Sequence, residues 1–561
     1  MKRILLAISA VCLLVTNAFA SDKYFQVEND FYQCAISSSQ IDSVVYSKSD
    51  ATLDFHYKDG HCVWAKDAVG YIDVTESPCD ESFTDSLHLD NLTQEKIAAL
   101  DEVTESVPDN KENPEYEDFI ERFNRSCKVK IKWNNDKAEV SVNPSDYDVS
   151  ASVSGADVVL TIEDKKVQVI LSGETASGSL KIYSDYKFRL DLDGVSISNP
   201  SGPAINIQSK NRVYIHLPEN KSNVLKSGAE YVKQLSPTGE EEDAKATLFS
   251  EGQLIFSGEG SLTVESPSHH GICSDDYIRF RSTLGDISVN AGKDAVHAKD
   301  YFLMYGGRLT AVAADNGIQV EKGYAAFYGG MSKIQSDDNG VETKSELTHT
   351  AYVLVAGNAN LDISSKEGSA IDCQDGFYSN GGNVRLQTGG AGGRGIRSKS
   401  KIVVENGFLA VELSDCKPVW NENNQDFTQP AALRSSDSII VSNALCSCCT
   451  KYDTQGAKVI NADSAVVISN SVVAVEAMQD DYENNEFDIK AKAVEGNDIA
   501  VLNKSMVYIS ARKNALCSEN SVVIGNSAVK LLSDSFDKTF LKYNKDFDLS
   551  GAFFYNKLVN E

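Results

Sequence analysis

The sequence predicts a mainly β protein built as a right-handed parallel β-helix, a solenoid with coils of about 22–24 residues. This prediction rests on a short internal repeat within Ser268–Glu342. In each copy a polar residue precedes a small one, at Gly271, Ala295, Gly317 and Gly340, and Ile or Val follows. A fixed period this short is typical of units that bury their apolar faces by stacking on their neighbours.

Short segments inside each repeat alternate apolar and polar residues, as in Tyr277–Phe280 and Asp286–Val289. Alternation with period 2 indicates β-strands, and Gly-rich corners separate the segments. We therefore expect the aliphatic residues after the small positions to stack as an inward ladder: Ile272, Val296, Ile318, Val341, Ile371 and Ile396.

The chain divides by pattern into four parts. These are a signal peptide (1–20), a small mixed N-terminal domain of unknown role (21–145), the parallel β-helix (146–535) and a C-terminal cap or tail (536–561). The repeat is absent before residue 146, where we expect a strand at Thr52–Tyr57, a helix capped by Thr93 and a second helix over Pro114–Phe123.

The first twenty residues have the features of an export signal. Lys2 and Arg3 precede the apolar run Ile4–Val15, and Ala18-Phe19-Ala20 offers a small-x-small cleavage site. We expect an exported protein that is secreted, attached to the cell surface or periplasmic. No later apolar run approaches the roughly 18 residues of a membrane span, so none is predicted.

The charge of the chain limits its partners. The formal net charge is -28, and removal of Lys2 and Arg3 would make it two units more negative. Nucleic acid is therefore excluded as an expected partner, because phosphate binding needs a basic surface. An acidic polysaccharide would need a divalent cation between the two polyanions, and calcium suits an acidic exported protein.

Eleven cysteines follow the predicted signal peptide, so at least one thiol is unpaired. We expect one or two disulfides among Cys34, Cys62, Cys79 and Cys127. The cluster Cys446–Cys449 lacks a second spaced pair and a nearby histidine, which favours a local disulfide or buried thiols over a zinc site.

Two columns of the repeat carry carboxylates and amides. We consider as calcium ligands Asp276, Asp294, Asp300, Asp315, Asn316, Asp337 and Asp338. Stacked side chains of this kind can supply the six to eight oxygens that calcium takes. The alternative is structural, since Asp and Asn at corners tolerate left-handed backbone and hydrogen-bond their own turns.

A second candidate site follows from strand alternation. If Ile278 and Phe280 point inward, the outward residues include Tyr277, Arg279, Arg281, Tyr301 and Tyr305. Stacked tyrosines offer flat platforms for sugar rings, and arginine can hold a uronate carboxylate in a bidentate pair. The alternative is that these side chains only cover the outside of a sheet.

Three longer stretches carry a family resemblance: Leu171–Leu217, Leu248–Val264 and His270–Ile278. They resemble the bacterial carbohydrate-binding family of right-handed parallel β-helices typified by a clostridial cellulose- and pectin-binding protein. The resemblance implies binding of plant cell-wall polysaccharide, notably pectin as polygalacturonate and also cellulose, calcium on the solenoid, and a fold similar to family 9 polysaccharide lyases. The chain departs at His269–Ile272 and Lys293–Val296, where the family often has Asp-Asp-Gly-Ile, and its Glu219–Leu225 loop lacks the family's Gly-Thr.

Catalysis is not expected. A lyase of this shape needs a base that faces calcium-bound substrate, and a hydrolase needs carboxylates on both sides of the scissile bond. The nearest candidates are His269-His270 and Lys293-Asp294, and neither forms such an arrangement in the sequence. We therefore predict a non-catalytic carbohydrate-binding protein, with a structural surface spacer or adhesin as the alternative and a polysaccharide lyase as a weaker one.

Overall fold

The computed structural model describes most of the chain after residue 98 and six short strands before it. The described residues are 24–28, 33–37, 41–47, 52–57, 60–65, 71–75, 99–106, 108, 114–346, 350–423, 425–483, 487–512, 514–533, 541–550 and 553–558. The predicted signal peptide and the start of the helix expected at Thr93 lie outside these residues. Leu100 and Val103, which we expected on that helix, are described and are not helical.

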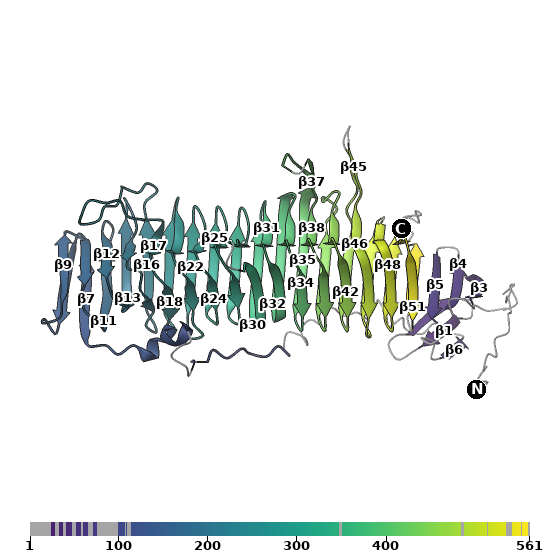
Figure 1. Ribbon diagram of the computed structural model, residues 1–561, viewed down its shortest axis with the longest axis horizontal. Helices are drawn as coiled ribbons and strands as arrows, with labels where there is room; N and C mark the ends of the chain where they lie inside the picture. Colours follow the sequence, from purple (N-terminus) through teal and green to yellow (C-terminus); the bar gives the residue numbers. More distant parts are fainter. Residues whose placement is uncertain are drawn as a thin grey trace. The chain divides into compact units, whose positions relative to one another are not determined.

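The chain forms two compact units, which are described separately. The central unit is Leu100–Gly389 with Arg394–Lys399, and the C-terminal unit is Ser400–Glu561 with Met1–Ala99 and Gly390–Gly393. The described residues of both are nearly all in strands, and the solenoid predicted from the repeat is confirmed (Figure 1). The helix expected over Pro114–Phe123 is two short 3-10 helices, η2 (Pro114–Asp118) and η3 (Ile120–Arg122).

Each coil of the central unit contributes parallel strands to three faces. The first face stacks β12 (Ser179–Ser184), β14 (Ile205–Gln208), β17 (Ala246–Ser250), β20 (His270–Ser274), β23 (Val296–Ala298), β26 (Ile318–Val320), β29 (Val341–Thr343), β31 (Ser369–Cys373) and β33 (Arg394–Ser398). The second face stacks β15 (Val213–His216), β18 (Leu254–Ser257), β21 (Ile278–Phe280), β24 (Phe302–Met304) and β27 (Ala325–Phe327), with the start of β13 (Phe188–Asn199) before them and the start of β30 (Tyr352–Ser365) and of β32 (Gly376–Ala391) after them. The third face stacks β16 (Ser222–Ser227), β19 (Ser261–Ser266), β22 (Asp286–Ala291), β25 (Arg308–Ala313) and β28 (Met331–Ser336) between the ends of β13, β30 and β32.

The core of the central unit consists of ladders of like side chains. On the first face the predicted ladder is confirmed: Ile272 pairs with Val296, Val296 with Ile318, Ile318 with Val341, and so on to Ile371 and Ile396, and all six side chains are buried. On the second face Phe256, Phe280, Phe302 and Phe327 form an aromatic ladder with ring centroids 5.2–5.6 Å apart. The predicted inward positions of Ile278 and Phe280 are confirmed as well.

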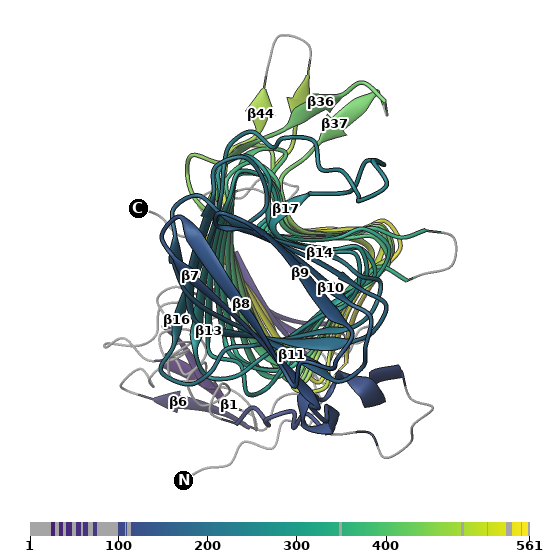
Figure 2. The same cartoon turned by 90° about the vertical axis from the view of Figure 1, so that its left-hand side faces the viewer.

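Antiparallel hairpins cover the first coil of the central unit. β7 (Cys127–Asn134) pairs in parallel with β11 (Val167–Thr175) and carries β8 (Lys137–Asn143), while β9 (Val149–Ser154) lies antiparallel on β10 (Asp157–Ile162). Figure 2 looks along the stack from this end. Since an open sheet edge invites pairing with other chains, this cover protects the solenoid. The parallel sheet thus includes residues on the N-terminal side of the boundary expected at 146.

The C-terminal unit repeats the design. Its strands are β34 (Ile402–Glu405), β35 (Phe408–Lys417), β38 (Ala431–Ser435), β39 (Ile439–Ser442), β40 (Leu445–Thr450), β41 (Lys458–Ala462), β42 (Ala465–Ser469), β43 (Val472–Ala477), β46 (Lys492–Leu502), β47 (Met506–Ala511), β48 (Asn514–Gly525), β49 (Ala528–Ser533), β50 (Leu541–Lys542), β51 (Asp546–Ser550) and β52 (Phe553–Leu558). Two loops extend from it as hairpins, β36 (Val419–Asn421) with β37 (Asp426–Thr428) and β44 (Tyr482–Glu483) with β45 (Asp488–Ile489).

Short strands from the first hundred residues belong to the same unit. β1 (Tyr24–Glu28) pairs with β2 (Gln33–Ser37) and β6 (Tyr71–Thr75), and β3 (Ile41–Ser47), β4 (Thr52–Tyr57) and β5 (Gly60–Ala65) form an antiparallel meander. β4 has the bounds expected from the sequence. β5 lies antiparallel on β52, so this edge of the parallel sheet is also paired.

Candidate functional site

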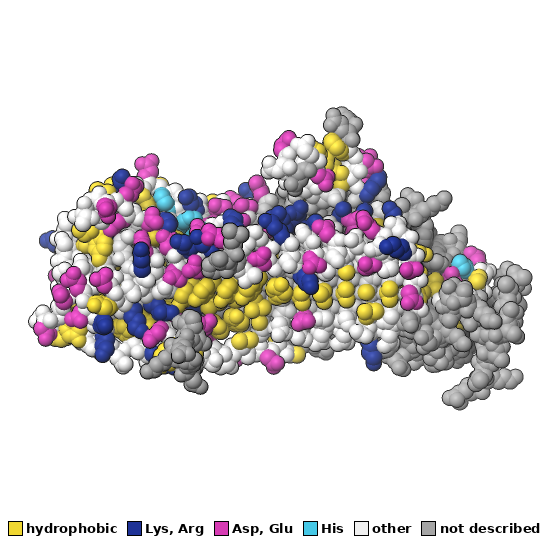
Figure 3. Space-filling model, viewed as in Figure 1, with side chains coloured by type: hydrophobic (Ala, Val, Ile, Leu, Met, Phe, Trp, Pro, Cys, Tyr) yellow, Lys and Arg dark blue, Asp and Glu magenta, His cyan; other side chains and the backbone are white. Residues whose placement is uncertain are grey.

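A row of stacked tyrosines lies on the outside of the second face. Tyr277, Tyr301, Tyr324 and Tyr352 lie one coil apart, with neighbouring ring centroids separated by 4.3, 5.3 and 4.7 Å and planes within 10° of parallel. Figure 3 shows hydrophobic side chains gathered in a band on this side, over the strands that Figure 1 labels β24 and β30. The row exists because parallel in-register coils place equivalent residues at the spacing of strands in a sheet.

A second, shorter stack accompanies this row. Tyr305 and Tyr328 lie with ring centroids 4.6 Å apart, and the guanidinium of Arg279 lies 4.7 Å from the centre of the Tyr305 ring. The sequence predicted that Tyr277, Tyr301 and Tyr305 point outward together, and the structure brings them to one surface.

The two arginines of this surface are covered by the chain's own acidic segment. We call the described part of Leu100–Phe123 the strap. Arg279 donates to Glu105 at 2.9 Å, to Glu115 at 2.8 Å and to Asp118 at 3.1 Å, and its side chain is 1% exposed. Arg281 donates to both oxygens of Glu105 at 2.9 Å, so Glu105 joins the two guanidinium groups.

Asp118 anchors the strap. Its side chain is fully buried, and it accepts hydrogen bonds from Arg212 at 2.7 Å, from Arg279 and from the Tyr277 hydroxyl. Phe119 is also buried, 4.3 Å from the guanidinium of Arg281. A carboxylate this deep is stable only because three donors compensate its lost hydration.

These contacts change the expected surface. Tyr277, Arg279 and Arg281 were expected to be exposed, yet all three are buried beneath the strap. Tyr301, Tyr305, Tyr324 and the rest of the row remain partly exposed. The strap was not predicted from the sequence. The signal that could have indicated it is the match between its carboxylates and the closely spaced Arg279 and Arg281.

The strap should respond to acid. Burial by itself raises the pKa of Glu105, but the positive charge of Arg281, the Ser282 backbone N–H and Arg279 together lower it below its usual value. A lowered pKa in the folded state contributes stability at neutral pH that is lost as the pH falls below about 4.5. We therefore expect the hydrogen-exchange protection factors of residues 114–123, which are corrected for the intrinsic effect of pH on exchange, to fall below this pH while those of the β21 amides stay high. Equal protection of the strap at pH 7 and pH 3.5 would contradict this.

The first predicted metal column is a hydrogen-bonded ladder. Asp294 Oδ1 accepts from the backbone N and Nδ2 of Asn316, each at 3.0 Å. Asn316 Oδ1 accepts from Asn339 Nδ2 at 3.1 Å, and Asn339 Oδ1 accepts from the backbone N of Ser369 at 2.9 Å. The amide oxygens of this column are therefore already occupied at the corners.

The other predicted ligands are spread along the corners. Asp276 accepts from Gln253 and from the Tyr277 backbone N, and Asp337 lies 3.6 Å from Lys366. Burial is the main cause that raises the pKa of Asp276, Asp315 and Asp338. The negative charge of a neighbouring carboxylate raises each pKa further: Asp300 acts on Asp276, Asp294 on Asp315, and Asp315 on Asp338.

Of the seven predicted ligands, only Asp294 lies in a described group of three potential metal-binding side chains. The group is His270, Asp294 and His297, with ligand atoms within 4.8 Å of one another. Calcium takes oxygens, and two of these three donors are imidazole nitrogens, so this group does not fit calcium. Sequence reasoning missed His297, which the register pairs with Cys273 on the preceding coil. Its ring centroid lies 4.4 Å from that of His270.

His297 lies between two carboxylates. Its Nδ1 is 2.8 Å from Asp294 Oδ2 and its Nε2 is 3.1 Å from Glu321 Oε1. Burial lowers the pKa of His297, but hydrogen bonds to Asp294 and Glu321 outweigh burial and raise it to about 9.

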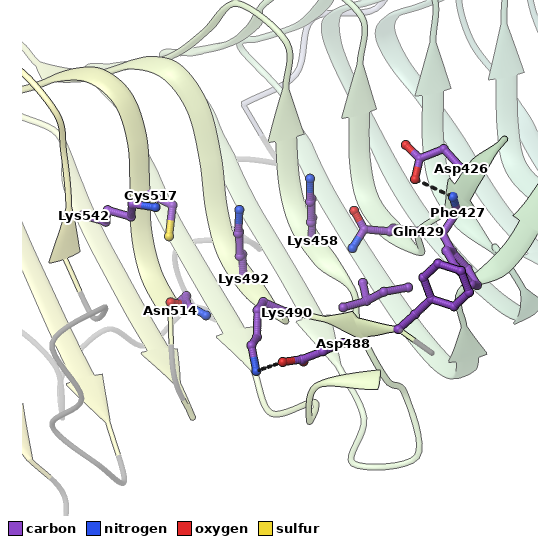
Figure 4. Close-up of a pocket in the computed structure, with 12 residues that line it drawn as sticks. Asp426, Phe427, Gln429, Lys458, Asp488, Lys490, Lys492, Asn514, Cys517 and Lys542 are labelled. Atoms are coloured by element: carbon purple, nitrogen blue, oxygen red, sulfur yellow. Dashed lines mark hydrogen bonds and ion pairs between the residues drawn. The ribbon is translucent and has the colours of Figure 1, made fainter. Parts of the chain in front are cut away.

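The C-terminal unit has an open groove of about 470 Å³ under its two hairpins (Figure 4). Its floor carries Lys458 and Lys492, which are paired on adjacent coils, and Lys542. Its wall is aromatic, because Phe427 and Phe487 of the two hairpins lie 4.8 Å apart. Lys458 and Lys492 share the carboxylate of Glu495. The groove depends on how the two hairpin loops fold back over the coils.

Most cysteines with a described side chain are buried. Cys127, Cys273, Cys373 and Cys517 are free and buried, and Cys416 is buried. Cys446 and Cys448 are also free, with sulfur atoms 3.8 Å apart, which agrees with the expected buried thiols. Cys127 therefore has no part in the disulfides expected near the N-terminus, and a bond among the other three lies outside the described side chains.

Comparison with known proteins agrees with the family resemblance. Residues 154–354 match the model of a family described as carbohydrate-binding domain-containing protein. A protein of that description from Acetivibrio thermocellus is 32% identical over 165 residues, which is 29% of this chain and 53% of the relative. The chain thus spans about half the length of the curated relative it matches.

A solved structure, the polysaccharide lyase-like protein from C. thermocellum in a gadolinium derivative, is 23% identical. It aligns with 49% of this chain and 96% of its own length, with a TM-score of 0.37. Separately, none of the helices among the described residues has the length and apolar character needed to cross a bilayer.

Proposed function

We propose that this chain, whose residues 154–354 match a carbohydrate-binding domain, is an exported protein that binds plant cell-wall polysaccharide without cleaving it. The observation that carries the proposal is the tyrosine row of the second face, which lies within the matched residues from Tyr277 to Tyr352. Aromatic rings at a regular spacing suit successive sugar rings of an extended polymer. The row supports binding along the solenoid axis and does not require a closed pocket.

Pectin, as polygalacturonate, is the preferred polymer in this proposal. The strap supports the choice of polygalacturonate, because its carboxylates show that Arg279 and Arg281 can bind a row of carboxylates. The strap carboxylates that pair with these arginines are Glu105, Glu115 and Asp118. Polygalacturonate would have to displace these carboxylates to reach the arginines, whereas cellulose would need only the exposed part of the tyrosine row. The arginine–carboxylate pairing is a charge-assisted interaction that a uronate can replace in kind.

A calcium requirement stays a prediction. The net charge of -28 opposes binding of a polyanion, and calcium between carboxylates would relieve that repulsion. The structure does not gather the predicted oxygen ligands at one point, so we assign calcium to no set of residues. Chelation should reduce polygalacturonate retention and leave cellulose binding unchanged if calcium bridges protein and polymer.

The lyase alternative has less support. His270, one of the two histidines considered as a base, lies in the buried group around Asp294. Incubation with polygalacturonate distinguishes the alternatives, since a lyase creates unsaturated ends that absorb in the near ultraviolet and a binding protein only retains the polymer. A structural spacer would do neither.

The tyrosine row can be tested with the double variant Tyr324→Ala and Tyr352→Ala, which leaves the strap contacts intact. We expect retention of both polygalacturonate and cellulose to fall roughly tenfold, because each ring contributes about 0.5–1.5 kcal/mol. Tyr452→Ala is the matched control, since Tyr452 is 69% exposed in the other unit.

The groove of the C-terminal unit gives the competing location. The double variant Lys458→Gln with Lys492→Gln tests this location. If it lost polygalacturonate binding while the Tyr324→Ala, Tyr352→Ala variant still bound the polymer, the groove would be the binding surface and the assignment to the tyrosine row would be wrong.

A further inference from the structure

The first face carries a group of nitrogen and oxygen donors at one corner. His270 begins β20, Asp294 lies at the corner before β23, and His297 lies within β23. These residues come from two adjacent coils, so the stacking of the solenoid brings them together. Asp294 is 1% exposed and His270 is 14% exposed by side chain, so the group is buried but reaches the surface on one side.

Asp294 lies close to a ring nitrogen of each histidine. Asp294 Oδ2 lies 2.8 Å from His297 Nδ1 and 3.1 Å from His270 Nδ1. Ligands at about 2.0–2.1 Å from a tetrahedral zinc ion lie roughly 3.3 Å from one another. Asp294 Oδ2 is therefore within a few tenths of an ångström of this separation from each histidine nitrogen, and the three ligand atoms all lie within 4.8 Å of one another.

One of these atoms lacks a hydrogen-bond partner. His270 Nδ1 is buried and, although close to Asp294, it makes no hydrogen bond of acceptable geometry. A buried polar atom without a partner is costly, and its presence here needs a reason. A metal ion between the two imidazoles and the carboxylate would supply that reason.

Other side chains hold the donors in place. Glu321 lies 3.1 Å from Nε2 of His297, the nitrogen opposite the one that faces Asp294. Asn316 donates twice to Asp294 Oδ1 and leaves Oδ2 directed at the histidines. A carboxylate behind a metal-binding histidine and a hydrogen-bonded ligand carboxylate are the usual outer contacts of such sites.

We propose that His270, Asp294 and His297 bind a divalent first-row transition metal, with zinc the best match to two imidazoles and one carboxylate. The partial exposure of His270 leaves room for water as a fourth ligand. Binding displaces the proton that His297 Nδ1 shares with Asp294, because only a deprotonated nitrogen can coordinate. The proposal does not depend on the glycan bound by the tyrosine row.

The test is a titration of chelator-treated, dialysed full-length protein with zinc, followed by calorimetry and by thermal unfolding. We expect one equivalent to bind with a dissociation constant in the micromolar range or below, the melting temperature to rise, and calcium at the same concentration to have no such effect. Cobalt substituted for zinc should give visible absorption bands typical of a tetrahedral site.

His270→Ala is the decisive variant, because it removes one ligand and only the 3.1 Å contact of His270 Nδ1 with Asp294, which keeps its hydrogen bonds from Asn316 and His297. It should fold normally and lose the bound equivalent, whereas His269→Ala should keep it. His269 is the matched control since it stacks on Tyr231 at 3.7 Å and lies outside the group. Stoichiometric zinc binding that is equal in both variants, or no binding to the wild type, would overturn the proposal.

Discussion

Replacing Asp118 with alanine should loosen the strap and increase the affinity of the protein for polygalacturonate. Asp118 is fully buried and joins Arg212, Arg279 and Tyr277. Removal of one partner from a buried ion-pair network leaves the others uncompensated and costs about 3–5 kcal/mol. We expect this loss to weaken the docking of the strap on the second face. Arg279 and Arg281 then become available to the uronates of the polymer.

Two measurements test this prediction. Hydrogen exchange should accelerate at residues 114–123, and polygalacturonate retention should rise while cellulose retention changes little. Glu121→Ala is the matched control: Glu121 also pairs with Arg281, but its side chain is 56% exposed, so its loss should cost less than about 1 kcal/mol. Weaker polygalacturonate retention by Asp118→Ala would mean that the strap forms part of the binding surface and does not compete with the polymer.

Replacing Ile318 with aspartate should prevent folding of the solenoid or lower its stability by several kcal/mol. Ile318 pairs with Val296 on one side and Val341 on the other, and its side chain is fully buried. A carboxylate there has no donor within an aliphatic ladder, so the protein must bury an unpaired charge or protonate it. Each coil contacts its neighbours, so the defect should spread along the stack.

Urea unfolding followed by circular dichroism provides the measurement. Val312→Asp is the matched control, because Val312 lies on β25 with 41% of its surface exposed. We expect the control to unfold within about 0.5 kcal/mol of wild type, as exposed substitutions usually do. An unchanged midpoint for Ile318→Asp would contradict the register of the ladder.

The sequence by itself determined the coils and their register. An aliphatic residue follows a small one at a fixed period, at Ile272, Val296, Ile318 and Val341. Because a shift of one residue would expose this whole apolar row, only one register of the strands buries it. The outward direction of Tyr277 and Arg279 followed from the same alternation.

Only the tertiary structure decided what covers that surface and which side chains meet at the corners. The strap lies more than 150 residues from Arg279 along the chain, and its docking depends on long-range charge pairing that has no period in the sequence. Likewise Asp294 resembled one more corner carboxylate until stacking placed it between His270 and His297. Periodic burial is a local property of the chain, whereas the fit between a non-repeating segment and a solenoid face depends on the completed fold.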